Sequence, residues 1–90
     1  MEIIILDGRR MLTFDDLHDY LKKSMRLPSH YGRNLDALAD CLGELGSNVT
    51  VILNNASEMN SGLGVYGDKL LRVFRDMSSE PGAFNFVISE

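Results

Sequence analysis

The sequence predicts a small α/β domain, with a three-stranded parallel sheet packed with three to four helices. Three short runs rich in β-branched or aromatic residues are typical of strands, and segments with leucines at helical spacing lie between them. Strands that alternate with helices pair in parallel, because each helical crossover returns the chain to the end of the sheet at which the previous strand began. With 90 residues the chain forms one domain, residues 1–90, since two cores of half that size would not fold unaided.

The three strands are expected at residues 3–6, 49–53 and 84–88. The first is an uninterrupted apolar run, which is typical of strands that a parallel sheet covers on both faces. Asp7–Gly8 ends this strand as a turn, and Pro81–Gly82 separates the last strand from the helix before it. The turn residues therefore mark the ends of the strands.

Three longer helices are expected between the strands. Thr13 is the expected N-cap of the first helix, which must end before Pro28 because proline clashes with the backbone ahead of it. The second begins near Asn34 and ends at Gly46, and the third covers residues 66–79. The residues expected on their buried faces are Phe14, Leu17 and Leu21, then Leu35, Leu38, Leu42 and Leu45, and finally Tyr66, Leu70, Val73, Phe74 and Met77.

Two local features are also predicted. The segment 54–65 is rich in Asn, Ser and Gly and is expected to be a loop with at most one short helical turn. On the first helix, Asp19 and Lys23 are four residues apart and are expected to form an ion pair.

The charge distribution excludes several classes of protein. The net charge is −4, and all of it arises from residues 30–90, where eight acids face four bases. Such a surface repels phosphates, so direct nucleic-acid binding is not expected. No apolar run approaches the roughly 20 residues of a membrane span. Cys41 is the single cysteine and no signal peptide is evident, so we expect a reduced, cytoplasmic protein without membrane contact.

Metal, cofactor and catalytic sites are not expected either. The two histidines and Cys41 lack the spacing of metal ligands. The glycine pattern at 62–67 does not directly follow a strand, so no nucleotide cofactor is predicted. Cleavage of RNA needs cationic groups around the phosphate, whereas Asp36 and Asp40 would repel it. We therefore expect a protein that is not an enzyme.

The most informative pattern is a row of acids on the second helix. Asp36, Asp40 and Glu44 lie four residues apart along one edge, where like charges cost a few tenths of a kcal/mol per pair. A second pair, Asp76 and Glu80, ends the third helix, where negative charge opposes the helix dipole. The pattern is compatible with an ordinary solvated face or with an acidic docking surface.

The segment 27–42, Leu-Pro-Ser-His-Tyr-Gly-Arg-Asn-Leu-Asp-Ala-Leu-Ala-Asp-Cys-Leu, resembles the barstar family of intracellular ribonuclease inhibitors. The preceding Asp-Leu-His at 16–18 and Leu-Lys-Lys at 21–23 fit the same pattern, and residues 73–76 are similar to a later helix of the family. The resemblance extends over nearly all of the chain. It implies a barstar-like α/β fold.

The resemblance also implies a function: inhibition of a secreted, basic ribonuclease of the barnase type by a protein that is monomeric when free. A loop and the helix after it would plug the active site, with Asp40 in the place of the substrate phosphate. His30 stands where the family usually has an aromatic residue that packs on the catalytic histidine of the nuclease, and Arg33 puts a positive charge beside this surface. The other residues assigned to the partner surface are Asp36, Asn34, Ala39, Gly43, Glu44, Leu45, Asp76 and Glu80. The alternative is a barstar-fold interaction module that binds a different basic protein.

Overall fold

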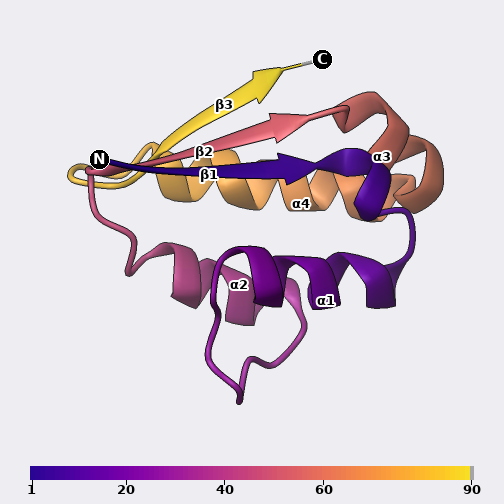
Figure 1. Ribbon diagram of the computed structural model, residues 1–90, viewed down its shortest axis with the longest axis horizontal. Coiled ribbons are helices and arrows are strands. Elements are labelled where there is room, and N and C mark those ends of the chain that lie inside the picture. Colours follow the sequence, from indigo (N-terminus) through magenta and orange to yellow (C-terminus); the bar gives the residue numbers. More distant parts are fainter. Residues whose placement is uncertain (90) are drawn as a thin grey trace.

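The computed structural model describes residues 1–89 and has the expected α/β architecture, with one open sheet of three parallel strands and four α-helices (Figure 1). A short 3-10 helix, η1, follows the first strand. In chain order the elements are β1 (Glu2–Asp7), η1 (Gly8–Arg10), α1 (Phe14–Ser24), α2 (Leu35–Leu42), β2 (Val49–Asn54), α3 (Ala56–Leu63), α4 (Val65–Ser78) and β3 (Asn85–Ser89).

The strands lie in the order β1-β2-β3, so that β2 is central and both neighbours run parallel to it. The register places Ile5, Ile52 and Val87 side by side across the sheet. Residues that are in register across neighbouring strands share a face of the sheet, so these three side chains lie on one face. Successive side chains along a strand alternate between the two faces. The residues that precede and follow them, such as Ile4 and Leu53, point to the other face.

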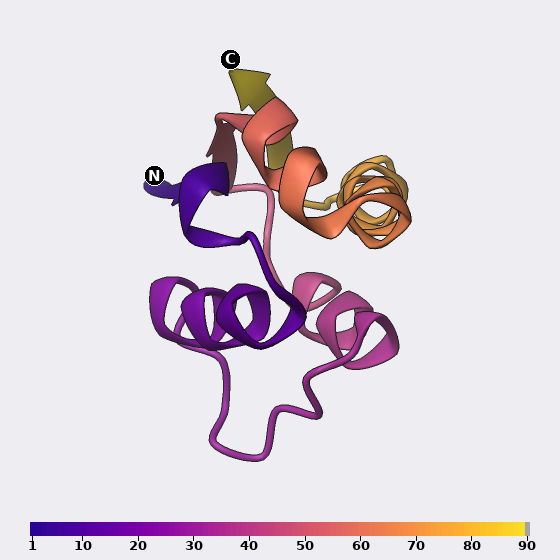
Figure 2. The ribbon, with the colours of Figure 1, turned by 90° about the vertical axis from the view of Figure 1, so that its right-hand side faces the viewer.

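The helices cover only one face of this sheet, as the two ribbon views show (Figures 1 and 2). On that face Leu6, Val51 and Leu53 are fully buried, and the rings of Phe74 in α4 and Phe86 in β3 stack with centroids 5.0 Å apart. The chain is tightly folded at the end of β1, where a Cβ on Gly8 would lie 2.2 Å from the carbonyl oxygen of Asn55. Only glycine fits at this position, which explains the turn expected there.

The expectation of a loop at 54–65 was wrong in part, because α3 makes two helical turns within it. Ala56 and Met59 are buried under η1 and α4, and Leu63 packs against the core. Their spacing of three and four residues is a weak helical signal that the surrounding Asn, Ser and Gly residues obscure. Tertiary burial of this small apolar face outweighs the poor helix propensity of its neighbours.

Two expectations about helix boundaries and faces are corrected. The second helix ends at Leu42 with Gly43 as its C-cap, so Leu45 lies beyond its end, although it packs against the core. Phe14 is 46% exposed, and its ring rests edge-on against His18 with centroids 4.7 Å apart. The first turn of α1 therefore lies at the rim of the core. None of the helices described in residues 1–89 is long and apolar enough to cross a membrane.

Candidate protein-docking site

The docking surface predicted from the sequence begins in the loop between α1 and α2. Asn34 caps α2, since its Oδ1 accepts a hydrogen bond from the Ala37 N–H at 2.7 Å. Its Nδ2 donates to the Gly32 carbonyl oxygen at 3.2 Å. The side chain of Asn34 thus fixes the start of the helix and the turn of the loop that precedes it.

A shallow hollow of about 230 Å³ separates this loop from α2. His30 lies on the loop side, and Asp40 and Glu44 lie on the helix side. The structure therefore brings together three of the predicted residues that are up to 14 positions apart in the sequence. The complete lining is Pro28, His30, Tyr31, Gly32, Ala37, Asp40, Cys41 and Glu44.

The acids of α2 project into solvent. Asp36, Asp40 and Glu44 are all exposed, and none of them forms an ion pair within residues 1–89. Asp36, in the first turn, is favoured by the helix dipole, but the two later acids are not. In the part of the chain that the structure describes, these carboxylates therefore have no cation as a partner.

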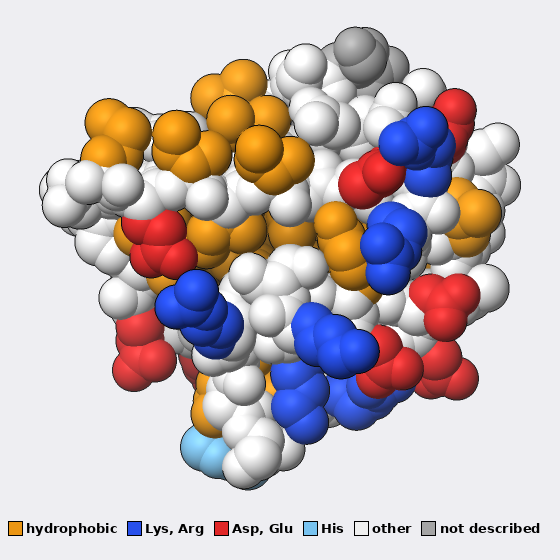
Figure 3. Space-filling view, in the orientation of Figure 1, with side chains coloured by type: hydrophobic (Ala, Val, Ile, Leu, Met, Phe, Trp, Pro, Cys, Tyr) orange, Lys and Arg blue, Asp and Glu red, His pale blue; other side chains and the backbone are white. Residues whose placement is uncertain are grey.

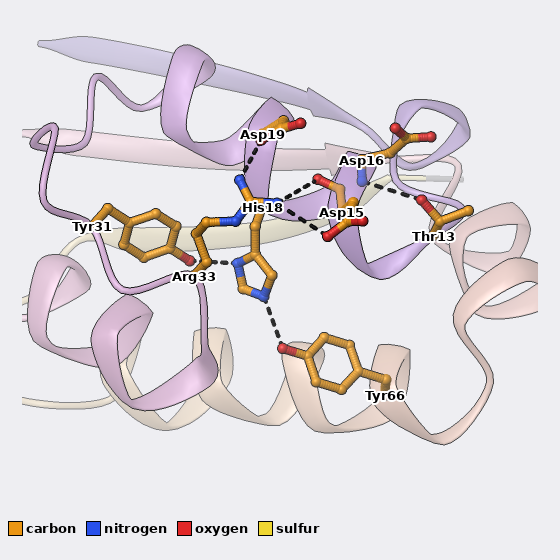
Figure 4. Close-up of polar contacts among 8 residues, drawn as sticks. All are labelled: Thr13, Asp15, Asp16, His18, Asp19, Tyr31, Arg33 and Tyr66. Atoms are coloured by element: carbon orange, nitrogen blue, oxygen red, sulfur yellow. Dashed lines mark hydrogen bonds and ion pairs between the residues drawn. The ribbon is translucent and has the colours of Figure 1, made fainter.

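Arg33, expected to place a positive charge beside this surface, is instead paired with α1 (Figure 4). Its guanidinium forms ion pairs with Asp19 and, at 3.3 Å, with Asp15. The expected pair between Asp19 and Lys23 is absent among the described residues, because Asp19 meets Arg33. Arg33 has a left-handed backbone conformation, with φ of 56°.

A buried histidine holds the same loop from the inside. His18 of α1 is fully buried, and its Nδ1 and Nε2 are hydrogen bonded to the hydroxyls of Tyr31 and Tyr66 at 2.7 and 2.8 Å (Figure 4). Burial, aided by the nearby Arg33 charge, lowers the pKa of His18, so the neutral ring is favoured. Burial also raises the pKa of the Tyr31 hydroxyl.

Sequence reasoning did not single out this histidine as a structural residue. The available signal was its position four residues after Phe14 and three before Leu21, which places a polar ring on the apolar face of α1. Its two hydroxyl partners lie 13 and 48 residues away in the chain, beyond any local pattern.

The remaining predicted residues lie in the second half of α2, just after α2 and near the end of α4. A Cβ on Gly43 would lie 3.3 Å from the terminal carbon of Met77, so the two helices approach each other there. Asp76 and Glu80 are exposed near this end of α4, and Asp76 shares a second hollow with Arg72 and Arg75. Ala39 and Leu45 are half-buried.

The described residues do not supply a metal site or an activated thiol. Within residues 1–89 no group of three or more His, Cys, Asp or Glu side chains could hold a metal ion. Cys41 is half-buried, and its burial together with the charges of Glu44 and Asp40 raises the pKa of the thiol. A raised pKa disfavours the nucleophilic thiolate.

Comparisons with known proteins agree with the resemblance seen in the sequence. The family model "Barstar (barnase inhibitor)" matches residues 1–89. A protein of Bacillus subtilis (strain 168) called "Putative ribonuclease inhibitor YrdF" is 43% identical over 81 residues, which cover 89% of this chain and 89% of that protein. With its three-stranded parallel sheet and four helices, the chain belongs to the barstar family.

Proposed function

We propose that this chain is a stoichiometric inhibitor of a basic ribonuclease of the barnase type, and not itself an enzyme. The loop before α2 and the exposed edge of α2 would enter the cleft of the nuclease. Asp40 would occupy the position of the substrate phosphate, with Asp36 beside it and Glu44 across the hollow from His30. One observation carries the proposal: Asp40 is exposed and forms no ion pair within residues 1–89. It keeps this position although the acids four residues before and after it on α2 repel it.

Electrostatics supports such a partner. A ribonuclease cleft holds cationic groups for the phosphate, and these would form charge-assisted hydrogen bonds with a carboxylate placed among them. The acidic field of α2 would also speed the encounter with a basic enzyme. The repulsion along α2 would then be relieved in the complex.

The hollow between loop and helix supports a role for His30. A side chain of the partner could enter it and contact His30 on one wall and Asp40 and Glu44 on the other. A cationic or imidazole side chain fits this lining best. Asp76 and Glu80, near the end of α2, would extend the acidic contact at its rim.

The test is to titrate the full chain into a guanyl-preferring ribonuclease and to follow RNA cleavage. We expect complete inhibition at a one-to-one ratio. Asp40→Ala should raise the inhibition constant by roughly 30-fold to several thousandfold, which corresponds to about 2–5 kcal/mol, because the cations of the nuclease would remain buried and unpaired.

Asp16→Ala is the matched control, since it removes the same charge from an exposed position on α1 away from the hollow. It should change inhibition by less than roughly threefold, mainly through the screened long-range field. Absence of inhibition at micromolar excess of the unaltered chain would count against this function. It would favour the alternative, a barstar-fold module for another basic protein.

A further inference from the structure

A third and larger hollow, of about 810 Å³, lies between η1 and α1. Arginines line it on the η1 side and lysines on the α1 side. The full lining is Arg9, Arg10, Leu12, Asp16, Asp19, Tyr20, Lys22, Lys23 and Leu27, and we call this site the basic hollow. It has no residue in common with the hollow beside His30. Its volume falls within the range of pockets that bind ligands.

The basic hollow carries positive charge on an acidic protein. Four of the nine Lys and Arg side chains line it, although the net charge of the chain is −4. In the space-filling view, Lys and Arg side chains gather, together with several acids, over the face on which α1 lies (Figure 3). Of the two acids in the lining, Asp19 is already paired with Arg33, which is not part of the hollow. Only Asp16 then offsets the four cations from within the lining.

Three of these four cations have no carboxylate partner among residues 1–89. Arg9 is paired with Asp7. Arg10, Lys22 and Lys23 form no ion pair within the same residues. Ion pairs in the described chain therefore leave these three charges unneutralised.

Contacts within the chain hold two of the three in place. The guanidinium of Arg10 lies over the Tyr20 ring, 5.2 Å from its centroid. The ring is itself fixed, because the Tyr20 hydroxyl accepts a hydrogen bond from the Asp7 N–H at 2.9 Å. The Nζ of Lys22 donates to the Ser29 carbonyl oxygen at 3.3 Å. Less side-chain freedom would therefore be lost when an anion binds these cations.

Apolar surface accompanies the cations. Leu12 is 43% exposed, and Tyr20 and Leu27 are half-buried. A ligand that carried only charge would leave this surface against water, whereas an apolar group would bury it. The lining therefore fits a ligand that combines anionic and apolar groups.

We propose that the basic hollow binds an acidic segment of a partner protein, in which an apolar residue lies between carboxylates. The cations come from two walls, with Arg9 and Arg10 on η1 and Lys22 and Lys23 on α1. A segment with several carboxylates would meet more of them than a single anion would. Each carboxylate would form charge-assisted hydrogen bonds with the arginines and lysines. The apolar residue would contact Leu12 and its neighbours.

A nucleic acid fits this surface less well than an acidic peptide. The exposed acids Asp15, Asp16 and Asp19 lie on α1, and they would repel a polyanion, as would the net charge of −4. A short segment with a few carboxylates meets less of this repulsion. The basic hollow lies outside the surface proposed for the ribonuclease, so this inference does not rest on that proposal.

Titration of the isotope-labelled full chain with the capped peptide acetyl-Glu-Glu-Leu-Glu-Glu-amide, followed by NMR, tests the proposal. We expect saturable shifts of the backbone amides of η1, Leu12 and residues 19–27, with an affinity in the high micromolar range at low salt that weakens at high salt. The peptide with Gln in place of each Glu should cause no saturable shift, because it lacks the charges. The peptide with Ser in place of Leu should bind roughly threefold to tenfold more weakly, because it buries less apolar surface.

A double variant tests the assignment of the site. Arg10→Gln with Lys23→Gln should weaken binding of the acidic peptide by roughly fivefold or more. Both side chains are exposed, so the fold should be kept, and the NMR spectrum checks this. The matched control is Lys69→Gln with Arg72→Gln, which removes one Lys and one Arg from exposed positions on α4 outside the hollow. It should bind the peptide almost as the unaltered chain does, since only the screened long-range field changes.

Several outcomes would overturn the proposal. They are the absence of saturable shifts, equal binding of the Glu and Gln peptides, and equal binding of the Leu and Ser peptides. A folded chain with Arg10→Gln and Lys23→Gln that keeps the full affinity would also overturn it. A short oligouridylate that shifts the same amides at lower concentration would identify a nucleic acid as the occupant instead. None of these measurements involves a ribonuclease, so the result is independent of the proposed function.

Discussion

The acids of α1 and the acids of α2 carry the same charge but have different surroundings. Asp15 and Asp19 are paired with Arg33, which the intervening loop directs towards α1. Asp36, Asp40 and Glu44 have no such partner within residues 1–89. Among residues 1–89, Arg33 thus pairs with the acids that help to hold the loop of the chain itself. The exposed acids of α2 have no such cation among these residues.

The loop is therefore fixed on its α1 side in two ways. Arg33 forms ion pairs at the surface, and His18 binds the Tyr31 hydroxyl in the interior. The ion pairs are exposed and contribute little, whereas a buried hydrogen bond is costly to break. Substitutions can separate the contributions of these two anchors to the free energy of unfolding. They can also test whether removing the α2 acids changes this free energy in the opposite direction.

The largest effect is expected for the interior anchor. His18→Leu should lower the free energy of unfolding by about 2–3 kcal/mol, because the Tyr31 and Tyr66 hydroxyls would both lose a buried partner. Urea unfolding followed by circular dichroism would measure this. Tyr66→Phe is the control that breaks only one of the two hydrogen bonds and should cost about 1 kcal/mol. Equal stability of His18→Leu and the unaltered chain would show that the ion pairs alone fix the loop.

A second prediction concerns pH. Because the pKa of His18 is lowered in the folded state, the unfolded chain binds more protons once the pH falls below about 6.5. The contribution of His18 to the free energy of unfolding should therefore be fully present above that pH. As the pH falls below it, the free energy of unfolding should decrease by up to roughly 1.4 kcal/mol per pH unit, until the pH passes the pKa of His18 in the folded state.

The matched variant for this experiment is His18→Gln, in which position 18 does not titrate. The charges that face the ring are those of Arg33, which lowers the pKa of His18, and of Asp15 and Asp19, which raise it. Urea unfolding of both proteins at several pH values gives the difference that His18 causes. A difference that stays constant from pH 5 to pH 7 would contradict the prediction.

The smallest effects compare the two acidic sets directly. Asp15→Asn with Asp19→Asn should slightly lower the free energy of unfolding, because the exposed pairs with Arg33 are lost. Asp40→Asn with Glu44→Gln should instead raise it by a few tenths of a kcal/mol, because a like-charge pair is removed. Both changes should shrink at high salt. The same sign for both double variants would refute the distinction drawn between the helices.

Much of the sheet and helix layer could be predicted from the sequence because it depends on local periodicity. The three strands occur where β-branched or aromatic runs predict them, each within one residue at either end. Thr13 caps α1 as expected, accepting a hydrogen bond from the Asp16 N–H at 3.1 Å. The second helix is shorter than its leucine stripe suggests, since Leu45 packs against the core from outside the helix.

What the sequence could not predict depends on contacts between distant segments. The two-turn helix α3 forms because η1 and α4 cover Ala56 and Met59, not because its residues favour helix. For the site, the acids of α2 could be recognised from their spacing, but the direction of Arg33 could not. That direction requires the left-handed backbone of Arg33 and the proximity of α1, neither of which is a local pattern.

The hydrogen bonds of His18 have a consequence for any partner that meets the loop. Tyr31, which lines the hollow beside His30, is held by a ring buried in the core. The conformational entropy of this segment is therefore lost when the chain folds, and little remains to be lost when another molecule docks. The free chain is preorganised at this loop, so its affinity for a partner that docks there should depend on complementarity rather than on ordering of the loop.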